Sequence, residues 1–127
     1  MRYNHFDSEF LHMEIKEGII YATYKAERID ARLAEQAIQV RLTFTRDQVL
    51  PVLIDVSSVK YVTKEAREIL SSERAGDHIA ASAAVIENAV TRSIARFFFK
   101  FQHPHYPFKL FSNTESAKNW LKEYIPA

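Results

Sequence analysis

Cysteine is absent from the 127 residues of this chain, which excludes disulfides, thiolate metal sites and a cysteine nucleophile. Glycine occurs only twice, whereas loops that cradle nucleotide phosphates need several glycines. No apolar run approaches the roughly 20 residues of a membrane-spanning helix. The opening ten residues, MRYNHFDSEF, lack the apolar core of a signal peptide. We therefore expect a soluble, cytoplasmic protein without a cofactor.

An excess of charge of either sign is also lacking. Seventeen basic and sixteen acidic residues leave a formal charge of +1, which provides no general field for nucleic acid. Hydrophobic residues make up 47% of the chain and charged residues 26%, which is close to the average of globular proteins. The length is typical of one domain, so we expect a single domain over residues 1–127.

The stretch from Leu50 to Arg74 is the most informative part of the sequence. Its β-branched and aliphatic start, with Pro51 near the beginning, predicts a strand that is buried on both faces and ends at Asp55. Thr63 is a suitable N-cap for the helix that follows, and Glu65 in the first turn complements the helix dipole. The bland role of the Asp55 carboxylate is to bind backbone N–H groups of the intervening loop. In open α/β sheets, ligands and partners bind outside such carboxyl ends of strands.

The remaining chain alternates strands with helices. Two strands joined by a tight turn at Glu17-Gly18 come first, and Asp30 caps a helix that runs to about Thr45. Gly76 is expected to end the helix that Thr63 begins. The further elements are a strand over 78–86 whose small residues let helices approach closely, a helix from Asn88, a strand over 108–111, and a last helix with a capping box of Ser112 and Glu115.

The predicted order is therefore β-β-α-β-α-β-α-β-α. It implies an α/β fold with a mostly parallel mixed sheet of about five strands and four helices.

The order and the segment VLIDVSSVKYVTKEAREIL resemble the STAS domain of the anti-anti-sigma factor, or SpoIIAA-like, type. The pattern is carried by Leu53, Ile54, Asp55, Val59, Tyr61 and Val62. The later stretch from Val90 through FFFKFQHPHYPFKLFSNTESAKNWL is more similar to another bacterial STAS-like branch than to the sporulation regulators. The resemblance implies the SpoIIAA-like fold and a non-enzymatic regulatory module that binds a protein partner, such as an anti-sigma-like or sensor protein.

The sequence departs from this family at the start of the helix. Anti-anti-sigma factors carry Asp-Ser-Ser-Gly there, and a kinase phosphorylates one of the serines. Thr63, Lys64, Glu65 and Ala66 occupy the matching positions here. The usual serine switch is therefore not expected, and a surviving switch would use Thr63, Ser57 or Ser58. The expected partner-binding residues are Asp55, Ser57, Ser58, Lys60, Tyr61, Thr63, Lys64, Glu65 and Glu68.

Other chemistry has weaker support. His103 and His105 could share a metal, but no spacing reveals further ligands, so no metal site is predicted. Asp55 has no His, Cys or Ser constellation at triad-like spacing, so no catalytic residue is predicted.

The helix expected from Asn88 leaves alternatives open. Arg92, Arg96 and Lys100 share one face and could contact an anion or a lipid surface. Phenylalanines between positions 97 and 101 could line the pocket of a small-molecule or lipid carrier, which is the alternative function. They could also form the seam of a homodimer.

Overall fold

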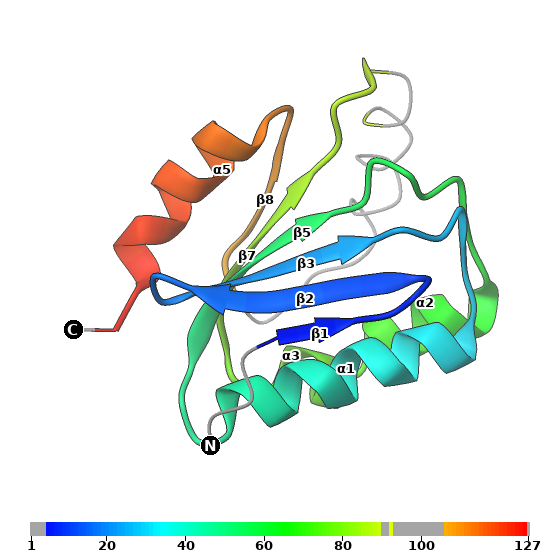
Figure 1. The fold of residues 1–127 in the computed structure, drawn as a ribbon, viewed down its shortest axis with the longest axis horizontal. Coiled ribbons are helices and arrows are strands. Elements are labelled where there is room, and N and C mark those ends of the chain that lie inside the picture. The colour runs from blue at the N-terminus through cyan, green and yellow to red at the C-terminus, as the bar shows by residue number, and fades with distance from the viewer. Residues whose placement is uncertain (1–4, 90–91, 93–105, 127) are drawn as a thin grey trace.

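The computed structural model describes residues 5–89, 92 and 106–126, and its centre is a six-stranded mixed sheet (Figure 1). The spatial order of the strands is β1 (His5–Asp7), β2 (Leu11–Lys16), β3 (Ile19–Tyr24), β5 (Leu50–Asp55), β7 (Ile79–Val85) and β8 (Phe108–Phe111). A separate pair is formed by β4 (Arg28–Ile29) and β6 (Tyr61–Val62). The helices are α1 (Ala31–Thr45), α2 (Lys64–Leu70), α3 (Glu73–Gly76) and α5 (Thr114–Leu121), followed by the 3-10 helix η1 (Lys122–Tyr124).

The sheet begins with an antiparallel part and continues in parallel. β1, β2 and β3 pair antiparallel, whereas β3, β5, β7 and β8 are parallel neighbours. Glu17 and Gly18 form the two-residue turn between β2 and β3, with φ values of 54° and 81°. Positive φ at both residues is the geometry of the hairpin turn that follows the twist of the strands. The predicted hairpin and the mixed sheet are confirmed, and β1 raises the strand number above the expected five.

Helices cover both faces of the sheet, which gives three layers (Figure 1). Leu33 and Ala34 of α1 belong to the apolar cluster that contains Val52 of β5. Ala117 of α5 belongs to a second cluster, with Leu53 of β5. Because successive side chains of a strand point to opposite faces, β5 contributes to both cores.

β5 lies at the centre of the sheet, between β3 and β7. Its first four residues are buried, and Pro51 is among the most deeply buried side chains. The register with β7 shifts between Leu50 and Pro51, where the missing N–H of proline interrupts regular pairing. The central, doubly covered strand predicted from the sequence is confirmed.

The helix that begins at Thr63 does not continue to Gly76, as the sequence prediction had it. α2 ends at Leu70, and α3 is a separate single turn. The Ser71 and Ser72 hydroxyls donate to the carbonyls of Arg67 (2.7 Å) and Ile69 (2.6 Å). These bonds offer the backbone an alternative to further helix.

The last helix also begins differently from the prediction. Asn113 is its N-cap, and its Oδ1 accepts a hydrogen bond from Ser116 N at 2.8 Å. The expected capping box of Ser112 and Glu115 is therefore wrong by one residue. Asn113 competes successfully because asparagine is at least as good an N-cap as serine. The helix expected from Asn88 falls mostly outside the described residues.

Candidate docking surface

The loop between β5 and α2 begins with a turn held by Asp55. The Asp55 carboxylate accepts a hydrogen bond from Ser57 N at 2.9 Å, and Val59 N donates to Val56 O at 3.0 Å. The bland role predicted for Asp55 is confirmed. One oxygen of this half-buried carboxylate shapes the loop.

The same loop is fastened to the segment that follows β3. Lys60 N and Tyr61 N both donate to Glu27 O, at 2.7 and 3.0 Å, and Thr63 N donates to Ile29 O at 3.0 Å. Arg28 and Ile29 pair in parallel with Tyr61 and Val62. Main-chain hydrogen bonds thus fix the loop at the carboxyl end of the sheet, where β3 and β5 both terminate (Figure 1).

Thr63 starts α2 as predicted. Its Oγ1 accepts a hydrogen bond from Ala66 N at 3.1 Å, and its side chain is buried. Glu65 lies in the first turn of the helix, where a carboxylate complements the helix dipole. The Thr63 hydroxyl is therefore engaged inside the protein and does not face the solvent.

The nine residues predicted for partner contact differ in how far their side chains are exposed to solvent. Asp55 and Ser57 are half-buried and Thr63 is buried. Tyr61 is 58% exposed, an unusually large exposure for an aromatic side chain within a fixed loop. The exposed members are Ser58, Lys60, Tyr61, Lys64, Glu65 and Glu68.

Two further exposed residues join this group and were missed by the sequence prediction. Lys60 Nζ lies 3.4 Å from Glu27 Oε1, and the Arg28 guanidinium carbon lies 5.9 Å from the centre of the Tyr61 ring. Glu27 and Arg28 are far from the loop in sequence, and no local pattern connects them to it. We call the following set the Tyr61 surface: Glu27, Arg28, Ser58, Lys60, Tyr61, Lys64, Glu65 and Glu68.

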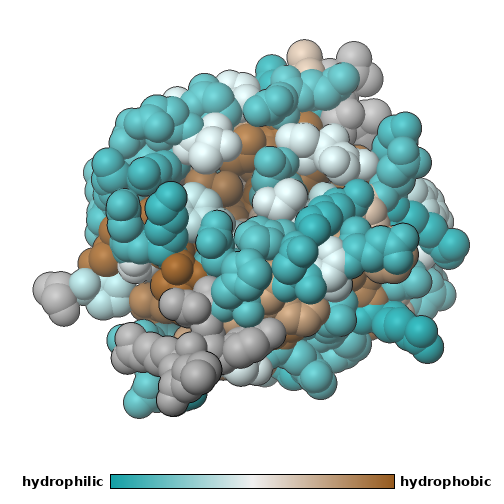
Figure 2. Space-filling view, in the orientation of Figure 1, coloured by the Kyte–Doolittle hydropathy of each residue, from teal (hydrophilic) through white to brown (hydrophobic). Residues whose placement is uncertain are grey.

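The surroundings of this surface are mostly hydrophilic. Figure 2 shows teal residues over the side of the molecule where the loops after β3 and β5 lie in Figure 1. Phe10, 50% exposed, also lies at this end, since its carbonyl accepts a hydrogen bond from Lys25 N just beyond β3. An exposed aromatic ring among charges is typical of a protein contact site.

The basic stripe is only partly within the described residues. Arg92 Nη1 donates to the carbonyls of Ile86 (3.1 Å) and Glu87 (3.3 Å), so this guanidinium binds the chain's own backbone. Arg96, Lys100 and the phenylalanines at 97–101 lie outside the described residues. The anion, carrier-pocket and homodimer predictions made for them stay predictions.

The described part of the chain has neither a candidate metal site nor a candidate membrane span. No group of three or more histidine, aspartate or glutamate side chains is placed to hold a metal there. His103 and His105 lie outside that part. None of the described helices combines the length and apolarity that crossing a membrane requires.

The layered mixed sheet has the SpoIIAA-like fold of two solved structures. A protein of the DUF3478 family from Shewanella loihica PV-4, solved with a SpoIIAA-like fold, is 17% identical, with a TM-score of 0.61 over 91% of this chain and 98% of that one. The unphosphorylated anti-sigma factor antagonist SpoIIAA is 8% identical, with a TM-score of 0.54 over 88% and 97%.

The chain belongs to the family described as Domain of unknown function (DUF7793), whose model matches residues 13–125. No curated protein matches the sequence. The resemblance inferred from the sequence and the predicted fold class are thereby confirmed.

Proposed function

We propose that this protein is a non-enzymatic regulatory module that binds another protein through the Tyr61 surface. The observation that carries the proposal is the exposed Tyr61 ring on a loop that main-chain bonds to Glu27 and Ile29 hold in place. Tyrosine is enriched among the residues that dominate binding energy. A loop that is already ordered loses little conformational entropy when a partner binds.

The charges around Tyr61 support a specific protein contact. Lys60, Lys64, Glu65 and Glu68 are all exposed and bear both signs. Mixed charges around an aromatic centre favour a partner with the complementary pattern over a uniformly charged polymer. SpoIIAA, which shares the fold, is described as an antagonist of an anti-sigma factor. We propose a partner of a similar kind, an anti-sigma-like or sensor protein.

We further propose that phosphorylation at the start of α2 does not switch this interaction. Thr63 uses its hydroxyl as the N-cap and is buried, and Glu65 already supplies a fixed negative charge. A phosphorylated Thr63 side chain would have to move out of its buried position and would then no longer cap α2. Mass spectrometry of protein purified from growing source cells tests this point, and phosphate on Thr63, Ser57 or Ser58 would contradict it.

A charge-swap experiment tests the docking surface. The double variant Lys64→Glu with Glu65→Lys reverses two adjacent exposed charges without altering the net charge. Lys122 and Glu123 offer a matched control, because they form the same adjacent exposed pair in η1, which follows α5 near the C-terminus (Figure 1). The partner is first identified by affinity capture from source cells, and the dissociation constant is then measured with both proteins purified.

We expect the swap at Lys64 and Glu65 to weaken the complex at least tenfold, since misplaced like charges at an interface are costly. The control swap at Lys122 and Glu123 should leave the dissociation constant unchanged. Circular dichroism spectra of both variants should match the wild type. Equal affinity of wild type and the Lys64 and Glu65 variant would refute the Tyr61 surface as the contact.

A further inference from the structure

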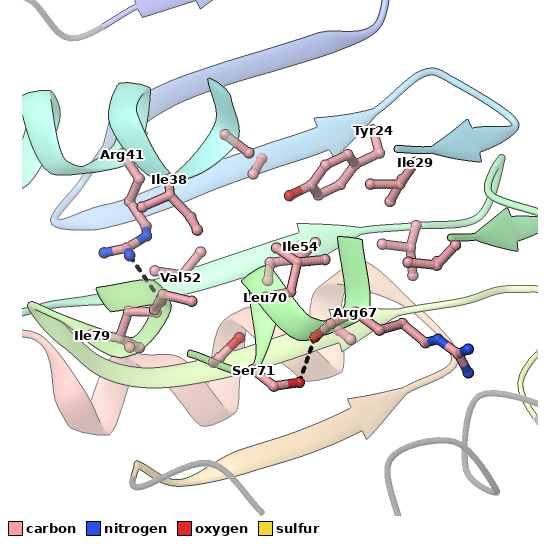
Figure 3. Close-up of a pocket in the computed structure, with 18 of the residues that line it drawn as sticks. Tyr24, Ile29, Ile38, Arg41, Val52, Ile54, Arg67, Leu70, Ser71 and Ile79 are labelled. Carbon is pink, nitrogen blue, oxygen red and sulfur yellow. Dashed lines mark hydrogen bonds between the residues drawn. The ribbon is translucent and has the colours of Figure 1, made fainter. Parts of the chain in front are cut away.

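A cavity of about 910 Å³ lies between the sheet and the helices α1, α2 and α3. Figure 3 shows side chains from both sides pointing into it. Ala22, Ser82 and Ala84 of the sheet and Ala37 of α1 are among its lining residues. Because these side chains are short, the two layers leave a space of the size that small-molecule pockets have, about 300–1,000 Å³.

Arg41 brings a buried cation to this space from α1 (Figure 3). It is only 5% exposed, and its Nη1 and Nη2 donate to the carbonyls of Asp77 (2.6 Å) and Ala75 (2.9 Å). These bonds use two of the five N–H donors of a guanidinium. In the described part of the chain, no carboxylate forms an ion pair with it.

The positive charge of Arg41 persists despite its surroundings. Burial lowers the pKa of its guanidinium, but arginine remains protonated at neutral pH. The charge of Asp77 acts on the Arg41 guanidinium, but Asp77 is exposed and forms no ion pair with it. A buried charge without a close opposite charge is unfavourable. An anion bound beside Arg41 would remove that cost.

Neutral hydrogen-bond donors accompany Arg41 on the cavity wall. Burial raises the pKa of Tyr24 to about 12 and also raises that of Tyr106, so both phenols keep their protons at neutral pH. Tyr24 and Tyr106 line the same cavity as Arg41. Ser82 Oγ is buried and has no hydrogen-bond partner among the described residues. A buried hydroxyl left without a partner is rare in native proteins.

Most other wall residues are aliphatic, among them Ile29, Ile38, Val52, Ile54 and Leu70. The remaining charged lining residues, Lys60, Arg67, Glu73 and Asp77, are exposed and are in contact with water. Among the described residues, the cavity wall is therefore mostly apolar and carries one buried positive charge, that of Arg41.

We propose that this cavity binds an amphipathic monocarboxylate, with its carboxylate at Arg41 and its apolar body between the sheet and the helices. The planar fork of the guanidinium matches a carboxylate. A single buried cation favours a single negative charge, because a second one would be buried without compensation. Protonated phenols can donate to the same head group. Lys60 and Tyr61 of the Tyr61 surface also line the cavity, but the head group is placed at Arg41, which is not part of that surface, so the two proposals can be tested separately.

Three probes of equal chain length test the charge preference. Dodecanoate, dodecanol and dodecyltrimethylammonium are titrated into the purified full chain below their aggregation concentrations, with isothermal titration calorimetry as the readout. We expect saturable one-to-one binding of dodecanoate, at least tenfold tighter than dodecanol. The cation should bind more weakly than the alcohol.

Three variants locate the site. Ala84→Leu fills part of the cavity, so it should weaken the binding of dodecanoate and of dodecanol by a similar factor of at least five. Arg41→Gln should remove the preference for dodecanoate over dodecanol. Because Arg41 also ties α1 to the turn around α3, Arg41→Lys is a second variant that keeps the charge and should retain a preference for the anion.

Equal affinities for dodecanoate and dodecanol, or no saturable binding of either, would overturn the proposal. Unchanged binding by Ala84→Leu would place the ligand elsewhere and would overturn it as well. The variant with Lys64→Glu and Glu65→Lys should bind dodecanoate like the wild type. A failure of protein capture and a failure of ligand binding are therefore distinguishable.

Discussion

Removing the N-cap of α2 should cost more than most surface substitutions. Thr63 Oγ1 accepts the hydrogen bond of Ala66 N, and Ala66 is fully buried. Loss of an N-cap typically costs about 1 kcal/mol, and removal of the buried Thr63 methyl group adds about 0.8 kcal/mol. We therefore expect Thr63→Ala to lower the free energy of unfolding by about 2 kcal/mol. Water cannot easily replace the lost acceptor, since Ala66 N is enclosed.

Two companion variants separate the hydroxyl from the methyl group. Thr63→Ser keeps the cap and should cost about 0.8 kcal/mol, the value of the methyl group alone. Thr63→Val keeps the buried volume but loses the cap, so it should cost about 1 kcal/mol or more. A loss of unfolding free energy that is largest for the Ala variant, smaller for Val and smallest for Ser is expected of an N-cap in a buried position.

The assay is equilibrium urea unfolding of the four proteins. Trp120, the one tryptophan of the chain, reports on α5 by fluorescence, while circular dichroism reports on all helices. Coincident transitions would support two-state analysis, and unchanged m-values would assign the differences to stability. A cost below about 0.5 kcal/mol for Thr63→Ala, or equal costs for the Ala and Ser variants, would refute the role of the hydroxyl.

Further predictions concern the hairpin and a surface carboxylate. Gly18→Ala should lower the free energy of unfolding by at least about 1 kcal/mol in urea, because φ is +81° and a Cβ would approach Ile125 Cγ2 to 2.8 Å; an unchanged midpoint would contradict this. The Lys25 ammonium and the His12 ring hold the pKa of Asp7 below its usual value, so Lys25→Met should raise that pKa in an NMR titration, and an unchanged value would contradict the ion pair. A lowered carboxylate pKa stabilises the fold above the ordinary aspartate pKa of 3.8, and this contribution is lost as the pH falls through the lowered pKa.

Interactions that are local in sequence could be predicted. Asp55 bonds a backbone N–H two residues ahead, and Thr63 bonds one three residues ahead. Such short-range patterns depend on residue type and spacing alone. The turn at Glu17-Gly18 could be predicted from the sequence for the same reason. These short-range features are the ones that indicate the loop carrying the candidate site.

Interactions between distant segments could not be predicted. β4 and β6 have two residues each, which is too short for any periodicity to reveal. The sequence therefore did not predict that Glu27 and Arg28 lie beside Tyr61.

The prediction placed the end of the helix at Gly76, but α2 ends at Leu70. The hydroxyls of Ser71 and Ser72, which precede Gly76, donate hydrogen bonds to backbone carbonyls and favour an earlier end.

The small residues of β7 were expected to let helices approach closely. Ala83 does pack in one core with Ala117 of α5. On the opposite face, Ser82 and Ala84 line the cavity instead. Small side chains permit close packing, but the lengths and positions of the helices decide whether the space is filled.

The outermost strands of the main sheet limit how this protein can associate. Within the described residues, β1 has three residues and β8 has four. Such short borders offer few unpaired backbone groups to an incoming peptide, which disfavours strand addition and fibril-like stacking. Main-chain pairing at these described borders is therefore disfavoured, so a partner of the kind proposed above would distinguish this molecule by the chemistry of its side chains.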